Sequence, residues 1–171
     1  MDILKKIVHI LSYFCYVIIG VYALVCVPMI FGSKPVVVLS GSMQPTYKVG
    51  TIIYYKPVPQ EEIHAGDVIT YQMGDTMVTH RVKEVVNGSE YVTQGDNNDV
   101  ADGKTVSYSA VLGKIGGAAI PVLGFGVQFI NNNMWVFAIL IGILVLEFLL
   151  SNIKNDKISV SENKERNNNE E

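Results

Sequence analysis

The chain has 171 residues, of which 49% are hydrophobic and 17% charged, and its formal net charge at pH 7 is −3. This length allows one domain with short attachments. No basic patch with interleaved aromatic residues occurs, which argues against a nucleic-acid partner. Both cysteines lie in the first apolar run, so the middle of the chain depends on no disulfide.

The first apolar segment, 7–33, contains no Asp, Glu, Lys or Arg. A bilayer core about 30 Å thick needs roughly 20 apolar residues in a helix, so this segment is long enough to span it. A cleavable signal peptide is the alternative, but its apolar core is normally about 7–15 residues long. We therefore expect a retained transmembrane anchor over 1–33. Lys5 and Lys6 precede the apolar run and predict a cytoplasmic N-terminus.

The region 34–115 alternates β-branched runs with turn residues, and no window of similar length has a helical period. This pattern is typical of strands, which we expect at 36–39, 51–55, 67–71, 76–79, 80–86, 90–94 and 107–111. Asn87-Gly88, between two of these runs, predicts a tight hairpin. The expected fold class is therefore mainly β, an antiparallel domain on the extracytoplasmic side of the membrane.

Three polar clusters interrupt these strands. The first, 40–46, contains Ser42, whose hydroxyl becomes a useful nucleophile only when a base removes its proton; a plain serine-rich loop is the alternative. The second contains His80, which can accept and return such a proton near neutral pH. The third, 95–102, carries aspartates that can orient a histidine, although a solvated turn or a calcium loop is also open. The twelve-residue calcium pattern ending in glutamate is absent.

Beyond the β domain, the chain returns to apolar sequence. The segment 116–133 is apolar but rich in glycine, and we interpret it as an interfacial connection lying on the membrane surface; a buried strand is the alternative. A second transmembrane helix is expected over 134–153, with Glu147 near its far end. Lysines follow it and predict a cytoplasmic exit. The polar tail 154–171 is expected to be disordered in the cytoplasm.

The segment Ser40-Gly41-Ser42-Met43-Gln44-Pro45-Thr46 resembles the Ser-Gly-Ser-Met-x-Pro-Thr box of type I signal peptidases. In that family the serine before methionine is the nucleophile, which here is Ser42. Most bacterial members carry a lysine base, whereas the matching residue here is His80. This difference indicates the Ser–His branch, which holds SipW-like, archaeal and ER-type enzymes (peptidase family S26B).

The acidic box of that branch has two important aspartates six positions apart, and Asp96 and Asp102 keep this spacing. The resemblance implies that Asp102 is the partner of His80, with Asp96 as the second candidate. It also implies an oxyanion hole formed by the Ser42 backbone N–H and the Ser40 hydroxyl. The implied fold is a signal-peptidase-like antiparallel β catalytic domain flanked by an N-terminal and a C-terminal transmembrane helix.

The resemblance implies a membrane-bound serine endopeptidase that removes N-terminal signal peptides after small residues, at sites of the Ala-x-Ala type. Preprotein signal peptides, the lipid bilayer and the secretion translocon are the expected partners, and no cofactor, metal or nucleic acid is expected. The expected location is the plasma membrane, with both termini cytoplasmic. Two alternatives stay open: a catalytically silent subunit that presents preproteins, and a self-cleaving repressor-type protease, which uses a lysine base and binds DNA.

Overall fold

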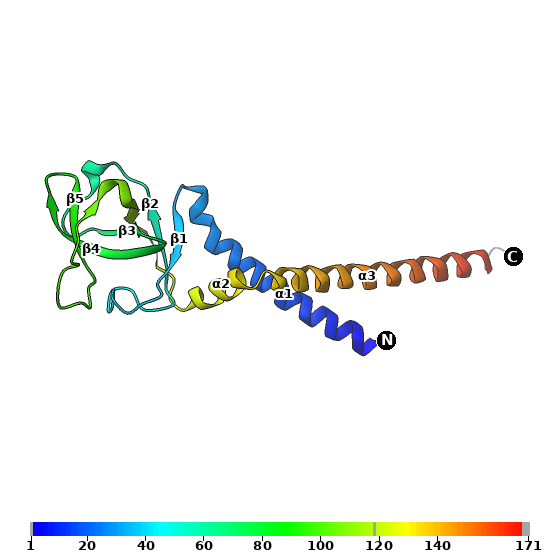
Figure 1. Cartoon of the computed structure of the whole chain (residues 1–171). Coiled ribbons are helices and arrows are strands. Elements are labelled where there is room, and N and C mark those ends of the chain that lie inside the picture. Colours follow the sequence, from blue (N-terminus) through cyan, green and yellow to red (C-terminus); the bar gives the residue numbers. More distant parts are fainter. Residues whose placement is uncertain (1, 118, 169–171) are drawn as a thin grey trace. The chain divides into compact units, whose positions relative to one another are not determined.

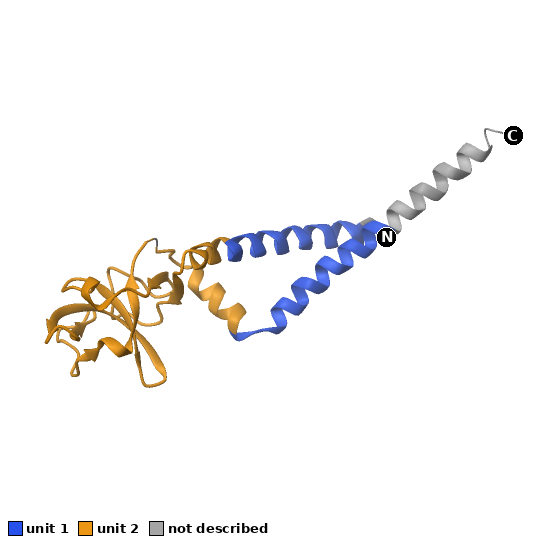
Figure 2. Ribbon diagram, turned by 90° about the horizontal axis from the view of Figure 1, so that it is seen from above, with its two compact units in different colours: residues 1–23, 132–171 blue, residues 24–131 orange. Residues whose placement is uncertain are grey.

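The computed structural model describes residues 2–117 and 119–168, with side chains from 3 to 152 apart from residue 118. The chain divides into two compact units, coloured separately in Figure 2. One unit takes residues 1–23 and 132–171, and the other takes residues 24–131. The first unit contains most of the two long helices, and the second contains the sheet.

The two long helices are α1, Asp2–Ile30, and α3, Trp135–Asn168 (Figure 1). Within them Ile3–Ile30 and Trp135–Asn152 are long and apolar enough to cross a membrane. A helix suits that setting because it satisfies every backbone polar group within the segment. Helix α3 continues past 153, where we expected the second span to end, and its side chains from there on lie outside the described residues. The expectation for the tail 154–171 stays a prediction.

Glu147 of α3 faces α1 within the first unit. One carboxylate oxygen lies 2.9 Å from His9 Nδ1, and the other accepts a hydrogen bond of 3.4 Å from the Tyr16 hydroxyl. Polar side chains between apolar helices pair with one another because lipid offers them no partner. Glu147 therefore connects the two helices.

The second unit is built on one antiparallel sheet of seven strands, in the order β1-β2-β7-β3-β4-β5-β6. This confirms the mainly β prediction. The strands are β1 Lys34–Val37, β2 Ile52–Lys56, β3 Val68–Met73, β4 Thr76–Val86, β5 Glu90–Gln94, β6 Val106–Ser107 and β7 Val111–Ile115.

Two strand predictions were wrong in their boundaries. The runs 76–79 and 80–86 form the single strand β4, because no turn residue separates them. The run 107–111 is divided by the short 3-10 helix η2, Tyr108–Ala110. This turn carries the chain from β6, which pairs with β5 at the sheet edge, to β7, which lies between β2 and β3. The Asn87-Gly88 turn does connect β4 to β5, and both residues have positive φ, +50° and +71°.

The sheet packs around two apolar clusters. The larger consists of Ile63, Ile69, Tyr71, Val82, Tyr91 and Val106. The smaller contains Val25, Ile52 and Tyr54, with Ile120 and Val127 against it. The connection after β7 contacts the domain through Ile120, and its expected position on the membrane surface stays a prediction. Ile120 forms an isolated bridge with Ile52, and the chain then enters helix α2, Leu123–Asn132.

Candidate active site

Ser42 lies in the turn that follows β1. The neighbouring Met43 is almost fully buried, with 1% of its surface exposed, and anchors the turn in the domain. The Tyr47 backbone N–H closes the turn by donating to the Met43 carbonyl at 2.8 Å. Burial of an apolar side chain this size is worth about 1.5–3 kcal/mol. The anchored turn therefore holds the Ser42 hydroxyl at a fixed place on the domain surface.

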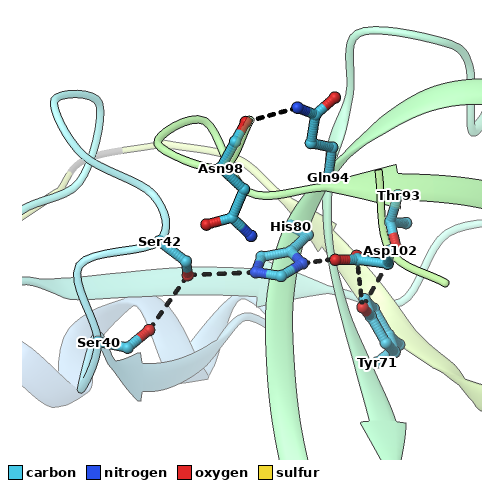
Figure 3. Close-up of polar contacts among 8 residues, drawn as sticks. All are labelled: Ser40, Ser42, Tyr71, His80, Thr93, Gln94, Asn98 and Asp102. Carbon is cyan, nitrogen blue, oxygen red and sulfur yellow. Dashed lines mark hydrogen bonds and ion pairs between the residues drawn. The ribbon is translucent and has the colours of Figure 1, made fainter. Parts of the chain in front are cut away.

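The His80 side chain connects this turn to the loop 95–102 after β5, which we call the acidic loop. It projects from β4 at the position paired with Ile69 of β3, and only 9% of the residue is exposed. Its Nε2 atom lies 3.1 Å from Ser42 Oγ, and its Nδ1 atom lies 2.7 Å from Asp102 Oδ2. Figure 3 shows the three side chains in one continuous line. Such a line can move a proton from a hydroxyl to an imidazole while a carboxylate fixes the ring.

Asp102 is held by two further donors that the sequence did not single out. The Thr93 hydroxyl donates to Asp102 Oδ2 at 2.6 Å, and the Tyr71 hydroxyl reaches the same oxygen at 3.3 Å. The Asp102 backbone N–H also donates to the Thr93 carbonyl at 2.8 Å. Burial raises the pKa of Tyr71 against the effect of its hydrogen bond with Thr93, and the nearby Asp102 charge raises it further. The phenol therefore stays protonated as a donor.

Asp96, the second candidate partner of His80, pairs with Arg81 instead. Its two oxygens accept hydrogen bonds from Arg81 Nε at 2.8 Å and from Arg81 Nη2 at 2.7 Å. The Thr46 hydroxyl also donates to it. The Arg81 hydrogen bonds, opposed by burial and supported by Thr46, hold the pKa of Asp96 below its usual value. Of the two aspartates, Asp102 contacts His80, and Asp96 ties the Ser42 turn to β4.

The backbone of the acidic loop packs directly on the Ser42 turn. The Asn97 N–H donates to the Ser42 carbonyl at 2.7 Å. Gly95 lies so close that a Cβ atom there would be 2.6 Å from the same carbonyl oxygen. On the other side of the turn, the exposed Ser40 hydroxyl lies 3.1 Å from Ser42 Oγ. Only glycine fits at position 95 without moving the proposed nucleophile, a requirement with no signature in the sequence beyond the glycine itself.

A cavity of about 480 Å³ opens beside the His80 ring. Tyr71, Met73 and Val78 line it from β3 and β4, and Asp102 lies at its wall. Ser42 is not among the lining residues, so the cavity adjoins the histidine rather than the serine. Among the side chains described, those of residues 3–117 and 119–152, no three His, Cys, Asp or Glu gather in a way that would hold a metal ion.

Three curated relatives illustrate what the chain is similar to. Signal peptidase I W of Bacillus subtilis is 37% identical over 99 residues, 55% of this chain and 52% of the relative. The signal peptidase complex catalytic subunit SEC11 of Plasmodium falciparum is 36% identical over 103 residues, 55% of this chain and 54% of the relative. The SEC11 subunit of Lodderomyces elongisporus is 33% identical over 133 residues, 70% of this chain and 79% of the relative.

The matched length differs between these relatives. The chain spans about half the length of the first two and about four fifths of the third. No protein-family model matches it. The identity and coverage of the third relative, together with the antiparallel β domain and the two apolar helices, show that the chain belongs to the signal peptidase family, and that it associates with a membrane.

Proposed function

We propose that the chain is a membrane-bound serine endopeptidase that removes N-terminal signal peptides from exported preproteins. The hydrogen-bonded line from Ser42 through His80 to Asp102 is the observation that carries this proposal. Membership of the signal peptidase family supplies the substrate class.

In the first half-reaction His80 Nε2 takes the proton from Ser42 as its Oγ atom attacks the scissile carbonyl. The Asp102 carboxylate accepts the Nδ1–H of His80, which fixes the tautomer that leaves Nε2 free to act as a base. His80 then gives the proton to the departing amine, and the signal peptide stays on Ser42 as an acyl ester. In the second half-reaction water attacks this ester with His80 again as the base.

The negative oxygen formed during attack needs donors of its own. We assign this role to the Ser42 backbone N–H and the Ser40 hydroxyl, as the family resemblance suggests. The Ser40 oxygen lies 3.1 Å from Ser42 Oγ, which is close enough for its hydroxyl to turn towards an oxygen developing there. Removal of one oxyanion donor typically costs about 10²–10³ in kcat.

The pairing of β4 supports an extended substrate beside this line. Strand β5 pairs with β4 only from Arg81 to Val86, whereas β3 pairs with it from Thr76 to Arg81. Within the described residues, the second edge of 76–80 therefore has no strand partner, and it leads directly to His80. A peptide can add to such an edge as another strand. We propose that the signal peptide binds there, with small residues before the cut at Ala-x-Ala type sites.

The proposed location is the plasma membrane, crossed twice, with the β domain outside and both termini in the cytoplasm. Lys5 and Lys6 before the first span, and Lys154 and Lys157 after the second, support this orientation because basic residues favour the cytoplasmic side. The domain would then lie at the outer surface of the lipid bilayer, beside the secretion translocon, where the substrate's own apolar segment emerges.

The proposal is tested by cleavage of a preprotein by the full chain in detergent or vesicles. We expect Ser42→Ala and His80→Ala each to abolish cleavage. Ser109→Ala and His64→Ala should retain it, since both control residues are exposed and their side chains contact Ser107 and Asp67 instead. Undiminished cleavage by Ser42→Ala or His80→Ala would contradict the mechanism. Failure of the unaltered chain to react with a serine-directed fluorophosphonate would instead favour the alternative, a silent subunit that presents preproteins.

A further inference from the structure

The side chain of Asn98 is held beside the line of Ser42 and His80, and no step described so far uses it. Its backbone is fixed on both sides: its N–H donates to the Gly95 carbonyl at 3.0 Å, and its carbonyl accepts from Gln94 Nε2 at 2.6 Å. These two hydrogen bonds fix the Asn98 backbone against Gly95 and against Gln94, the last residue of β5.

The carboxamide points towards the space next to Ser42 and His80 (Figure 3). Asn98 Nδ2 and Ser42 Cβ each lie 2.9 Å from the point that a Cβ atom on Gly95 would occupy, so they are separated by no more than twice that distance. Among the side chains described, from 3 to 117 and 119 to 152, none forms a hydrogen bond with this carboxamide, and no backbone group does. Because those groups leave the carboxamide unbonded, a half-turn about its Cβ–Cγ bond can present either Nδ2 or Oδ1 to a ligand.

The side on which Asn98 lies indicates the ligand atom. Figure 3 shows Ser40 and Asn98 on opposite sides of the hydrogen bond between Ser42 and His80. If the scissile oxygen turns towards Ser40, the scissile nitrogen turns towards His80 and the side of Asn98. We propose that Asn98 binds the leaving group, with its Oδ1 atom accepting the N–H of the scissile nitrogen. This inference rests on the proposed function.

The contact between Asn98 and the scissile nitrogen would act when the amine leaves the tetrahedral intermediate. When the tetrahedral intermediate collapses, the C–N bond breaks and its electron pair stays on nitrogen, which takes the proton from His80 Nε2. The acyl group remains on Ser42 Oγ, and the nitrogen keeps its original hydrogen. That N–H must leave the water that solvated it and needs an acceptor during bond cleavage. Asn98 Oδ1 supplies the acceptor on the same side as the proton donor.

An ester substrate separates this role from a general effect on the site. Replacing the scissile amide by an ester in an otherwise identical peptide gives a leaving oxygen that carries no hydrogen, so the contact with Asn98 cannot form. For Asn98→Ala we expect kcat/KM on the amide to fall roughly tenfold, the upper value for one neutral hydrogen bond. We expect kcat/KM on the ester to stay within about twofold, because it never had that hydrogen bond.

Two further variants complete the test. Asn98→Asp keeps an oxygen acceptor, so its ratio of amide to ester kcat/KM should stay near that of the unaltered chain, whatever its absolute rates. Asp99→Ala removes an exposed side chain from the same loop and should leave both substrates unaffected. An equal loss on both substrates in Asn98→Ala, or no loss on either, would overturn the role of Asn98. If the unaltered chain cleaves neither substrate, or Ser42→Ala cleaves them, the proposed function itself fails.

Discussion

Replacement of Gly95 by alanine tests whether the acidic loop positions Ser42. The added Cβ atom would lie 2.6 Å from the Ser42 carbonyl oxygen and 2.9 Å from Ser42 Cβ, whereas Cβ atoms in proteins essentially never come within 3.0 Å of another heavy atom. Both contacts involve Ser42 itself, and one of them is backbone. The turn and the loop must therefore move apart, because no flexible side-chain end can give way in their place.

The size of this movement follows from the contact distances. Relief of the closest contact from 2.6 Å to between 3.0 and 3.4 Å requires about 0.4–0.8 Å. The Asn97 N–H bond to the Ser42 carbonyl, now 2.7 Å, lengthens with it, as does the 3.1 Å separation between Ser42 Oγ and His80 Nε2. A misplacement near 1 Å can cost about 10² in rate, and overpacking costs about 1–3 kcal/mol in stability.

We expect Gly95→Ala to lower kcat by roughly 10- to 100-fold in the preprotein cleavage assay. Reactivity with a fluorophosphonate should fall in parallel, since it also needs His80 to activate Ser42. Gly116→Ala is the matched control, because a Cβ atom there meets nothing within 4 Å and the backbone φ is not positive. Full activity in a folded Gly95→Ala protein would refute the conclusion that this contact positions the serine.

Three further predictions concern the supports of the site and of the helices. Thr93→Val removes the 2.6 Å hydrogen bond to Asp102. Since bonds to charged groups are worth roughly 1.5–3 kcal/mol, we expect kcat to fall about 10- to 150-fold with KM unchanged; an altered KM would instead indicate a disturbed substrate site. The folded pKa of Asp96 is lowered by Arg81, so its stabilisation is present above the unfolded pKa and lost as pH falls through the folded one. Asp96→Asn should therefore lower the melting temperature at pH 7, and the gap should close below about pH 4; a gap that persists in acid would contradict this. Glu147→Leu should lower the thermal stability of the helices in detergent more than Glu147→Gln, which can still hydrogen-bond, and equal stability of the two variants would count against the helix connection.

The sequence predicts much of the architecture because its signals are local. Two long apolar runs indicate membrane helices, and β-branched runs between turn residues indicate an antiparallel sheet. Asn87-Gly88 predicts its hairpin because both positions need positive φ. The insertion of β7 between β2 and β3 carries no such signal, because it depends on pairing between residues distant in the chain. The same holds for the division of 107–111 by η2.

The sequence predicts some residues of the candidate site better than others. Ser42 and His80 stand in a specific motif and at its matching base position, and the structure places their side chains 3.1 Å apart. Spacing alone leaves Asp96 and Asp102 as alternatives, because only the path of the loop decides which carboxylate reaches the ring. Threonine is common in strands, so nothing in the sequence marks Thr93, and its contact with Asp102 follows only from the register of β5.

Detection of a covalent acyl-enzyme intermediate tests most directly whether Ser42 is the nucleophile. The full chain is mixed with the ester form of a signal-peptide substrate, quenched in acid at early times and digested, and the peptide containing Ser42 is examined by mass spectrometry. We predict that the mass of the acyl group appears on Ser42 before free signal peptide accumulates, and that His80→Ala prevents it. Product formation with the acyl group on another residue, or with no acylated peptide at any time although a serine-acylated standard survives the quench, would contradict it.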